Sequence, residues 1–439
     1  MIEPQTIDSP LVGSNGATDA ASERFDDVHR DDVHRSEVRR DEVHRSDVRR
    51  SEVRRDVLRG AESWDGGGAG GQTSGSSASR RIRTPLANRD AGTGGGLLAE
   101  LYAPVAEPMA LVDGRITREL QNRYESLNEV LRHGTQLGGK RMRPALTLLA
   151  AVAASSENAS SSDASSDAAH SSQWTPPGGW ESHVVLGTVI EMVHTATLIH
   201  DDVLDDATHR RHVQTINARH GVDTSILLGD YLFASAYRLA ATLPTTDAAL
   251  AIGEAATLVC EGELRQVLDR DDWEMDQSTY IELIRGKTAR LLETACRLGA
   301  HYASATSVAT DAMATYGDAL GIAFQIADDY LDIWGDGDRI GKTLGTDLQQ
   351  GKPTLPILRL LESVSDGKRH QLIETLRGPA DLRYHRIKDD LDHSDARAYT
   401  ASVAKHYRDI AVDALADLAD SPAKRSLIRI ADFSIARTF

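Results

Sequence analysis

Two acidic runs of the same form, each inside an apolar stretch with the composition of a helix, constrain the fold of this chain most strongly. They read Asp201-Asp202-Val203-Leu204-Asp205 and Asp328-Asp329-Tyr330-Leu331-Asp332, 127 positions apart. The first and last aspartates of each run are four residues apart, which places them on one face of a helix. Because like charges repel when they are stacked in this way, a cation must compensate them.

The kind of cation follows from the ligands. Clusters of carboxylates that leave coordination sites open suit Mg²⁺, which usually retains several waters and takes its remaining ligands from substrate phosphates. We therefore predict that the two runs form two facing walls that bind Mg²⁺ around a diphosphate.

The part of the chain from residue 97 onward predicts an all-α domain, a single large helical bundle covering residues 97–439. Its segments are rich in Ala and Leu and have helical periodicity. Helices are expected at 99–132, 143–155, 182–206, 223–242, 246–267, 277–303, 308–334, 353–363, 367–377, 397–417 and 423–436. The stretch 155–179 is polar and ends in two prolines and two glycines, so we expect an exposed inserted loop there.

Residues 1–96 have a different character. A charged five-residue unit recurs six times between Asp26 and Arg55, and Gly-rich and Ser-rich sequence follows it. A period of five matches neither a helix nor a strand, so the valines of the repeat form no continuous apolar stripe. We expect a disordered extension with a flexible linker. A role in partner binding or in a coiled coil is the alternative.

Composition narrows the class of function and the location. The formal net charge of −17 opposes general binding to nucleic acid, which needs a basic surface. The two cysteines, Cys260 and Cys296, lack the spacing of a metal or redox motif and indicate a reduced compartment. No segment has the length and apolarity of a membrane span or a signal peptide. The expected location is the cytoplasm, and a peripheral contact with a membrane stays open.

Basic residues supply the expected sites for phosphate. Lys140, Arg141 and Arg143 follow a pair of glycines in the segment GGKRMRP, where backbone amides can join side chains around an anion. An ordinary helix start with loop glycines is the alternative reading of this segment. His194 lies seven residues before Asp201, about two helical turns, and therefore projects on the same face. Further basic or polar residues lie near the two runs: Arg210, Arg211, Lys287, Thr288, Lys342 and Lys352.

These motifs, in this order, resemble those of the trans-isoprenyl diphosphate synthases, in particular the long-chain polyprenyl diphosphate synthase branch. Besides GGKRMRP they are EMVHTATLIHDDVLDDATHRR, LLGDYLFASA, EGEL, GKTARL, FQIADDYLDIWGD and GKTLGTDLQQGKPTLP. The likeness covers residues 100–439. It implies an all-α bundle of the isoprenoid synthase type with a central cavity, usually as a homodimer. His212, where the family typically has Gly, departs from the pattern.

The resemblance also implies roles for individual residues. Metal ligands would be Asp201, Asp205, Asp328 and Asp332, with Asp202 and Asp329 in support. Isopentenyl diphosphate would contact Lys140, Arg143, His194 and Arg211, and Arg141 is expected among the substrate-binding residues. Allylic diphosphate would contact Arg210, Lys287, Thr288, Gln325, Lys342 and Lys352. The residues expected to act in catalysis are Asp201, Asp202, Asp205, Arg210, Lys287, Asp328 and Asp329.

The expected reaction is head-to-tail condensation of isopentenyl diphosphate with an allylic diphosphate, farnesyl or geranylgeranyl diphosphate, in the presence of Mg²⁺. Ala196, five positions before Asp201, and Thr197 are small where an aromatic side chain would close the product tunnel in this family. They predict a product of roughly six or more isoprene units, because Ala196 lies about 7.5 Å deeper along the helix. Close helix packing is the alternative reason for their small size.

Other functions fit the motifs less well. A terpene cyclase would normally show a different second metal motif, and a head-to-head synthase would lack GGKRMRP. A synthase of short products and a subunit of a heteromeric synthase stay open as alternatives. A respiratory quinone side chain is the expected destination of a long product.

Overall fold

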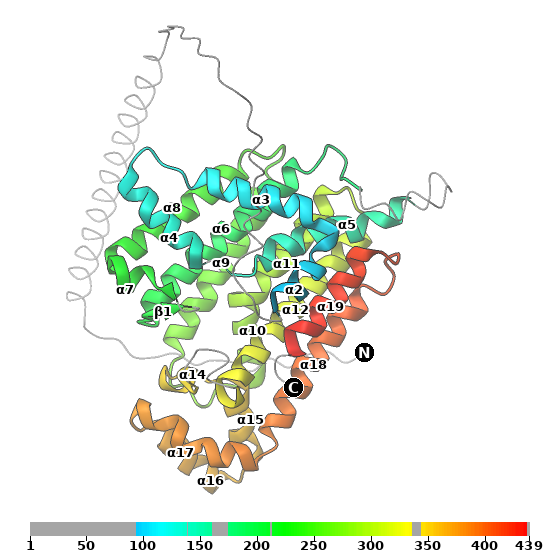
Figure 1. Ribbon diagram of the computed structural model, residues 1–439. Helices are drawn as coiled ribbons and strands as arrows, with labels where there is room; N and C mark the ends of the chain where they lie inside the picture. The colour runs from blue at the N-terminus through cyan, green and yellow to red at the C-terminus, as the bar shows by residue number, and fades with distance from the viewer. Residues whose placement is uncertain (1–93, 138, 160–173, 211–212, 336–343, 437–439) are drawn as a thin grey trace, which may run out of the picture. The chain divides into compact units, whose positions relative to one another are not determined.

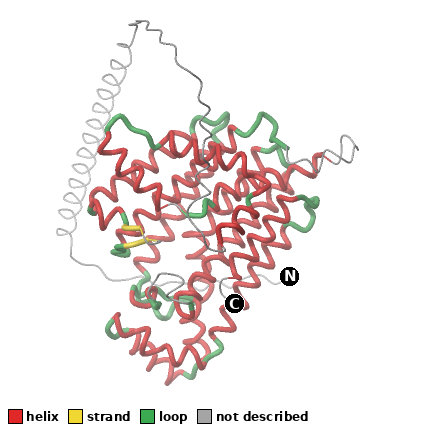
Figure 2. Tube along the Cα trace, viewed as in Figure 1, coloured by secondary structure: helices red, strands yellow, loops and turns green. Residues whose placement is uncertain are grey.

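The computed structural model describes residues 94–137, 139–159, 174–210, 213–335 and 344–436, all within one compact unit, Arg83–Phe439. As the sequence predicts, these residues form an all-α bundle, and the only sheet within the described ranges is one two-stranded hairpin (Figure 1, Figure 2). The expected disordered extension, apart from residues 94–96, lies outside the described residues.

The elements up to residue 268 are α2 (Gly94–Leu101), a 3-10 turn (Ala103–Val105), α3 (Ala106–Glu119), α4 (Glu125–Leu137), α5 (Met142–Ala159), α6 (Glu181–Leu204), β1 (His209–Arg210), β2 (Val213–Gln214), α7 (Ile216–His220), α8 (Val222–Ala240) and α9 (Asp247–Leu268). The later elements are α10 (Gln277–Ile284), a π-helical turn (Arg285–Ala289), α11 (Arg290–Tyr302), α12 (Ser307–Trp334), α14 (Thr346–Gln349), α15 (Leu355–Ser363), α16 (Asp366–Leu376), α17 (Ala380–His393), α18 (Ala396–Ala414) and α19 (Pro422–Ala436).

The two helices that end in the acidic runs, α6 and α12, pass through the core. Nearly every side chain of α6 from His183 to Ile199 is buried, because this stretch is apolar on all sides. Within the described part of the chain, α6 is the one helix long and apolar enough to cross a membrane, but 78% of its apolar window is buried inside the structure. That burial is typical of a core helix.

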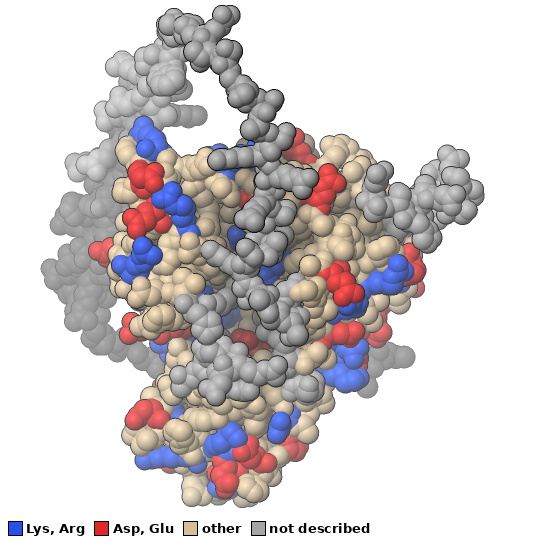
Figure 3. Space-filling view, viewed as in Figure 1, with Lys and Arg blue, Asp and Glu red and all other residues tan. Residues whose placement is uncertain are grey.

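A smaller group of helices, α14 to α17, lies at one end of the main bundle (Figure 1). Its apolar cluster includes Leu348, Ile357, Leu372 and Ile387, and it is separate from the main core. Basic and acidic side chains are interspersed over this end of the molecule (Figure 3). Lys388 and Asp392 of α17 form one ion pair. Helix α14 lies against the end of α12, where its backbone bonds Asp332.

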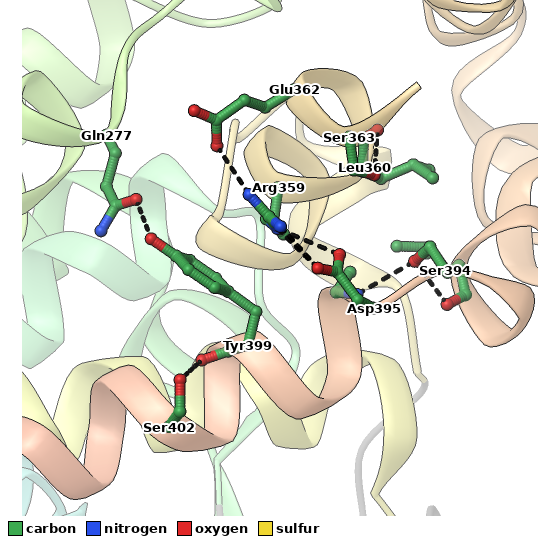
Figure 4. A network of polar contacts seen from close by, with 11 residues as sticks. Gln277, Arg359, Leu360, Glu362, Ser363, Ser394, Asp395, Tyr399 and Ser402 are labelled. Atoms are coloured by element: carbon green, nitrogen blue, oxygen red, sulfur yellow. Dashed lines mark hydrogen bonds and ion pairs between the residues drawn. The ribbon is translucent and has the colours of Figure 1, made fainter. Parts of the chain in front are cut away.

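A polar network fastens α15 to α18 and α10 (Figure 4). Arg359 donates three hydrogen bonds to Asp395, at 3.0, 3.2 and 2.5 Å, and its guanidinium lies 4.5 Å from the ring centre of Tyr399. The Tyr399 hydroxyl donates to Gln277 at 2.6 Å. Because Arg359 is partly exposed and its partner Asp395 is 51% exposed, each contact is weak in water, and together they orient the helices more than they stabilise them.

Several expected helix boundaries were wrong. The single helix expected at 99–132 is divided into α2, a 3-10 turn, α3 and α4. Pro104 interrupts the first part, and after α3 the Asn128 side chain bonds the backbone of Asn122 in both directions, which fixes a loop. The expected loop at 155–179 begins later, because α5 continues to Ala159, and residues 160–173 lie outside the described residues. The bundle begins at Gly94, three residues earlier than expected.

Two further differences concern the second half. The helix expected at 277–303 contains the π-helical turn at Arg285–Ala289. Helix α17 was not predicted, because one of the three side chains that it buries at a spacing of four, Arg383, Ile387 and Leu391, is charged. Its apolar stripe is therefore too short to recognise from sequence.

Candidate active site

The first acidic run forms the C-terminal end of α6, and its second aspartate is buried. Asp202 is 1% exposed, and its Oδ1 accepts hydrogen bonds from Arg210 Nε and Nη2, both at 2.8 Å. Arg210 lies on β1, which pairs antiparallel with β2 in the register Arg210–Val213. Burial raises the pKa of Asp202, and the Arg210 guanidinium opposes that rise. The other oxygen, Oδ2, is buried and accepts no hydrogen bond from the described residues.

Asp201 faces a cation carried by the π-helical turn. Burial raises the pKa of Asp201 to about 7, with Lys287 opposing and Glu263 adding to the rise. Lys287 Nζ lies 2.8 Å from Glu263 Oε1 on α9, and both side chains are mostly buried. The Asp201 and Glu263 carboxylates therefore share one lysine. A single cation near two buried carboxylates leaves negative charge that a metal ion can neutralise.

The π-helical turn that carries Lys287 is held by two glycines on neighbouring helices. A Cβ at Gly262 of α9 would lie 2.7 Å from the Lys287 backbone nitrogen, and one at Gly321 of α12 would lie 2.4 Å from Ala289 Cα. Only glycine at these two positions allows α9 and α12 to approach the π-helical turn this closely. Local distortions of this kind occur often at functional sites.

The second acidic run lies at the end of α12, and its second aspartate is again buried. Asp329 is 3% exposed; its Oδ2 accepts a hydrogen bond from Tyr280 Oη at 2.6 Å, and its Oδ1 accepts one from Gln325 Nε2 at 2.9 Å. Gln325 Oε1 in turn accepts from Thr288 Oγ1 at 2.9 Å. Burial, together with the charge of Asp347, raises the pKa of Asp329 to about 7. Gln325 and Thr288 thus form one network with the acidic run.

Asp332, near the end of α12, contacts the start of α14. Its two oxygens accept hydrogen bonds from the backbone nitrogens of Thr346 and Asp347, at 3.1 and 3.2 Å. Gly345, whose φ of 73° suits glycine, donates to the Asp332 carbonyl at 2.7 Å. Burial and the Asp347 charge raise the pKa of Asp332 to about 8. This end of α12 is therefore bonded directly to the backbone of α14.

Lys352 brings the two acidic runs into one region. Its Nζ lies 3.3 Å from Asp205 Oδ1 of the first run and 3.8 Å from Asp347 Oδ1 beside the second. The side chain of Lys352 is 12% exposed, so the charge is partly shielded from water. The ends of α6 and α12 thus meet at α14. Asp328 is half-buried in the same run.

The three basic side chains at the start of α5, Lys140, Arg141 and Arg143, have different surroundings. Lys140 Nζ lies 5.1 Å from the centre of the Phe433 ring, and Arg143 is in the first turn of α5. The Arg141 guanidinium instead contacts two carboxylates of the interior, Glu191 on α6 and Asp113 on α3. The structure thus pairs Arg141 with carboxylates of the protein, and the expected contact of Arg141 with substrate stays a prediction.

The remaining expected residues lie along α6 or outside the described residues. His194 is half-buried, Ala196 is fully buried, and Thr197 Oγ1 donates to the His194 carbonyl at 2.8 Å. Arg211 and Lys342, which were expected to contact substrate, lie outside the described residues.

Sequence reasoning did not assign roles to four residues of this region: Glu191, Glu263, Tyr280 and Asp347. Glu191 could have been found by the argument used for the aspartates, because it is an acid within an apolar helix. Tyr280 carries no such signal, since a tyrosine in an apolar helix is usually a core residue.

Comparison with known proteins agrees with this geometry. Residues 124–389 match the family described as Polyprenyl synthetase. The octaprenyl diphosphate synthase of Escherichia coli (strain K12) is 31% identical over 342 residues, 77% of this chain and 99% of the relative. The nonaprenyl diphosphate synthase of Mycobacterium tuberculosis is 33% identical over 342 residues, 77% and 95%. Component 2 of the heptaprenyl diphosphate synthase of Geobacillus stearothermophilus is 34% identical over 264 residues, 60% and 76%.

Solved structures give the same result. A decaprenyl diphosphate synthase from Rhodobacter capsulatus superposes with a TM-score of 0.68 at 31% identity, covering 78% of this chain and 99% of that one. A polyprenyl synthase from Caulobacter crescentus, complexed with calcium and isoprenyl diphosphate, superposes with a TM-score of 0.68 at 30% identity, covering 80% and 100%.

Proposed function

Because the chain belongs to the polyprenyl synthetase family and is a prenyltransferase, we propose that it condenses isopentenyl diphosphate head-to-tail with an allylic prenyl diphosphate. The observation that carries the proposal is the position of Lys352, which joins Asp205 of the first acidic run to Asp347 beside the second. Two carboxylate groups that are far apart in the sequence then face a shared site, together with the buried Lys287.

The proposed metal is Mg²⁺, held by Asp201, Asp205, Asp328 and Asp332. The residues fit this ion because every donor is an oxygen, and the buried Oδ2 of Asp202 next to them accepts no hydrogen bond from the described residues. Among the residues that the structure describes, no three acidic, histidine or cysteine side chains are close enough together to hold a metal ion by themselves. Mg²⁺ does not need three protein ligands in one group, because it completes its coordination shell with water and substrate phosphate. When bound, Mg²⁺ would neutralise charge on the leaving diphosphate.

The reaction is proposed to break the allylic C–O bond, with the electron pair leaving on the diphosphate. Lys287 and Lys352 stabilise that charge from a mostly buried position, where electrostatic interactions are stronger than in water. The double bond of isopentenyl diphosphate attacks the allylic carbon to form the new C–C bond. One proton of the former isopentenyl group then passes to the released diphosphate, so no protein nucleophile or base is required.

The proposed product has roughly six or more isoprene units, because Ala196, about 7.5 Å along α6 from Asp201, leaves room for a long tail. The names of the octaprenyl and nonaprenyl relatives agree with a long product. A196F should shorten the products, with A398F at an exposed position of α18 as the control. Mass spectrometry of the products measures this, and an unchanged distribution from a folded A196F variant would contradict the argument.

The decisive experiment uses the purified single chain with farnesyl diphosphate, isopentenyl diphosphate and Mg²⁺. We expect polyprenyl diphosphates that disappear with EDTA and return with added Mg²⁺. Product that forms only after a second polypeptide is added would favour a heteromeric synthase, of which the Geobacillus relative is named a component. A product that stops at four units, one more than the farnesyl primer, would favour a short-chain synthase. Absence of product in all mixtures would refute the proposal.

We further propose a cytoplasmic homodimer. Large apolar side chains are exposed on α8 and α9, among them Leu227 at 67%, Leu264 at 63% and Leu268 at 79%. Such exposure is costly for a monomer and marks an interaction surface. Both cysteines are free, in keeping with a reducing compartment. Sedimentation of the wild type and of L264E should give a dimer and a weaker dimer, and a monomeric wild type would contradict this. Release of a long product at a membrane surface is part of the same proposal.

A further inference from the structure

Three cations in the segment Lys140 to Arg143 would be expected to serve one substrate, but the structure gives the middle one different partners. Arg141 Nη1 lies 2.8 Å from Glu191 Oε1, and Arg141 Nε lies 3.3 Å from Asp113 Oδ1. The Arg141 side chain is 16% exposed and that of Glu191 is 3% exposed. This is a buried ionic cluster that joins the loop before α5 to α3 and α6.

The backbone of Arg141 is unusual as well. Its φ is 53°, in the left-handed region that bulky side chains rarely adopt. Such conformations persist where surrounding contacts determine them, and they are often found at functional sites. The turn that sets the directions of Lys140 and Arg143 is therefore held at Arg141.

Glu191 and Asp201 lie on the same uninterrupted helix, α6. Ten residues separate them, which corresponds to about 15 Å of helix. The Arg141–Glu191 pair thus attaches the basic loop at a fixed distance from the first acidic run. The two diphosphates of the proposed reaction must be held at one relative distance for the reacting carbons to meet.

We propose that Arg141 is a positioning residue that does not contact isopentenyl diphosphate, and that through Glu191 it sets the distance between the basic loop and the acidic run on α6. This inference rests on the proposed function. A role in stability alone is a weaker account, because buried ion pairs can often be replaced by apolar residues without loss of stability.

The experiment is a double-mutant cycle with R141K, E191Q and the two combined. Steady-state assays give kcat and the KM of each substrate, and thermal denaturation reports folding. If Arg141 acts through Glu191, both single variants should raise the KM of isopentenyl diphosphate and lower kcat, and their effects should not add. The expected change is about tenfold, since a misplacement of 1 Å can cost roughly 100-fold. The KM of the allylic substrate should stay unchanged.

The triple variant R141M/E191M/D113N removes all three charges and tests positioning apart from folding. We expect the triple variant to fold, and we expect its KM for isopentenyl diphosphate to be raised above the wild-type value, as in the single variants. R377M, in an exposed ion pair of α16 with Glu374, is the control and should match the wild type.

Three outcomes would overturn the inference. In the first, E191Q has wild-type kinetics while R141K is impaired, which indicates direct contact of Arg141 with substrate. In the second, the effects of the two single variants add in the cycle. In the third, the triple variant folds and has wild-type kinetics. If the triple variant does not fold, the cycle decides. A wild-type chain that forms no product would instead refute the proposed function, and this inference with it.

Discussion

The two acidic runs have the same pattern of aspartates but are compensated in different ways. In the first run, cations face all three carboxylates: Lys287 faces Asp201, Arg210 faces Asp202, and Lys352 faces Asp205. In the second run, the contacts to Asp329 and Asp332 come from neutral donors, namely a tyrosine, an amide side chain and two backbone N–H groups. The two walls of the site are therefore electrostatically unlike.

Burial distinguishes the aspartates within each run that can act on a substrate from those that support the wall. In both runs, the second aspartate is buried and bonded within the protein, so it supports the wall. The first aspartate, Asp201 or Asp328, is only partly buried. Burial and the charge of Asp347 raise the pKa values of Asp329 and Asp332 to about 7 and about 8, whereas at Asp201 the cations Lys287 and Arg210 oppose the rise. A divalent ion should therefore matter more to the second wall.

The largest effect is expected when the first aspartate of either run is neutralised. D201N and D328N should each lower kcat on the order of 1,000-fold, because each removes a proposed ligand of the Mg²⁺ that would neutralise the leaving diphosphate. Radiolabelled isopentenyl diphosphate measures the rate. D381N, at an exposed position of α17, is the control. Wild-type turnover in either variant would show that the run does not take part.

The next largest effect concerns the charged partner of the first run. R210M leaves the Asp202 carboxylate buried without its cation, which should lower the free energy of unfolding by about 3 kcal/mol. Denaturant unfolding of the metal-free protein measures it. R210M/D202N should recover most of the loss. A single variant as stable as the wild type would mean that water reaches Asp202.

The neutral partner of the second run should matter less. Y280F removes one hydrogen bond to Asp329 while Gln325 still donates the other, so we expect a loss of about 1–2 kcal/mol. The same unfolding experiment measures it, and Y399F, at a partly buried hydroxyl bonded to Gln277, is the matched control. A loss equal to that of R210M would erase the difference between the walls.

A pH dependence of stability is also expected without metal. Asp332 and Asp329 remain protonated in the folded protein up to about pH 8 and pH 7, but ionise near pH 4 when unfolded. The folded state binds more protons in this range, so stability should fall as pH rises, and stop falling above pH 8. Each group contributes at most about 1.4 kcal/mol per pH unit. Melting temperatures in EDTA at pH 6.5 and 7.5 measure this, and D332N should flatten the slope. A slope that is unchanged in D332N would contradict the assignment.

Long apolar helices could be predicted closely from the sequence. The expected helices at 182–206 and 308–334 correspond to Glu181–Leu204 and Ser307–Trp334, because buried faces repeat at the helical period over many turns. Prediction failed where the signal was short or local. The division of 99–132 depends on one proline and an asparagine loop, and the π-helical turn depends on glycines of two other helices.

The sequence by itself determined that each acidic run lies at the end of a core helix, because apolar periodicity fixes the helix and the aspartate spacing fixes their shared face. It could not determine how each carboxylate is compensated. The partners of Asp202, Asp329 and Asp205 lie 8, 49 and 147 positions away along the chain. Only the tertiary structure brings these partners together, by placing β1 beside the end of α6, α10 beside the end of α12, and Lys352 beside Asp205. The tertiary structure likewise decided that Arg141 faces inward, since the charge of an arginine is visible in a sequence but the direction of its side chain is not.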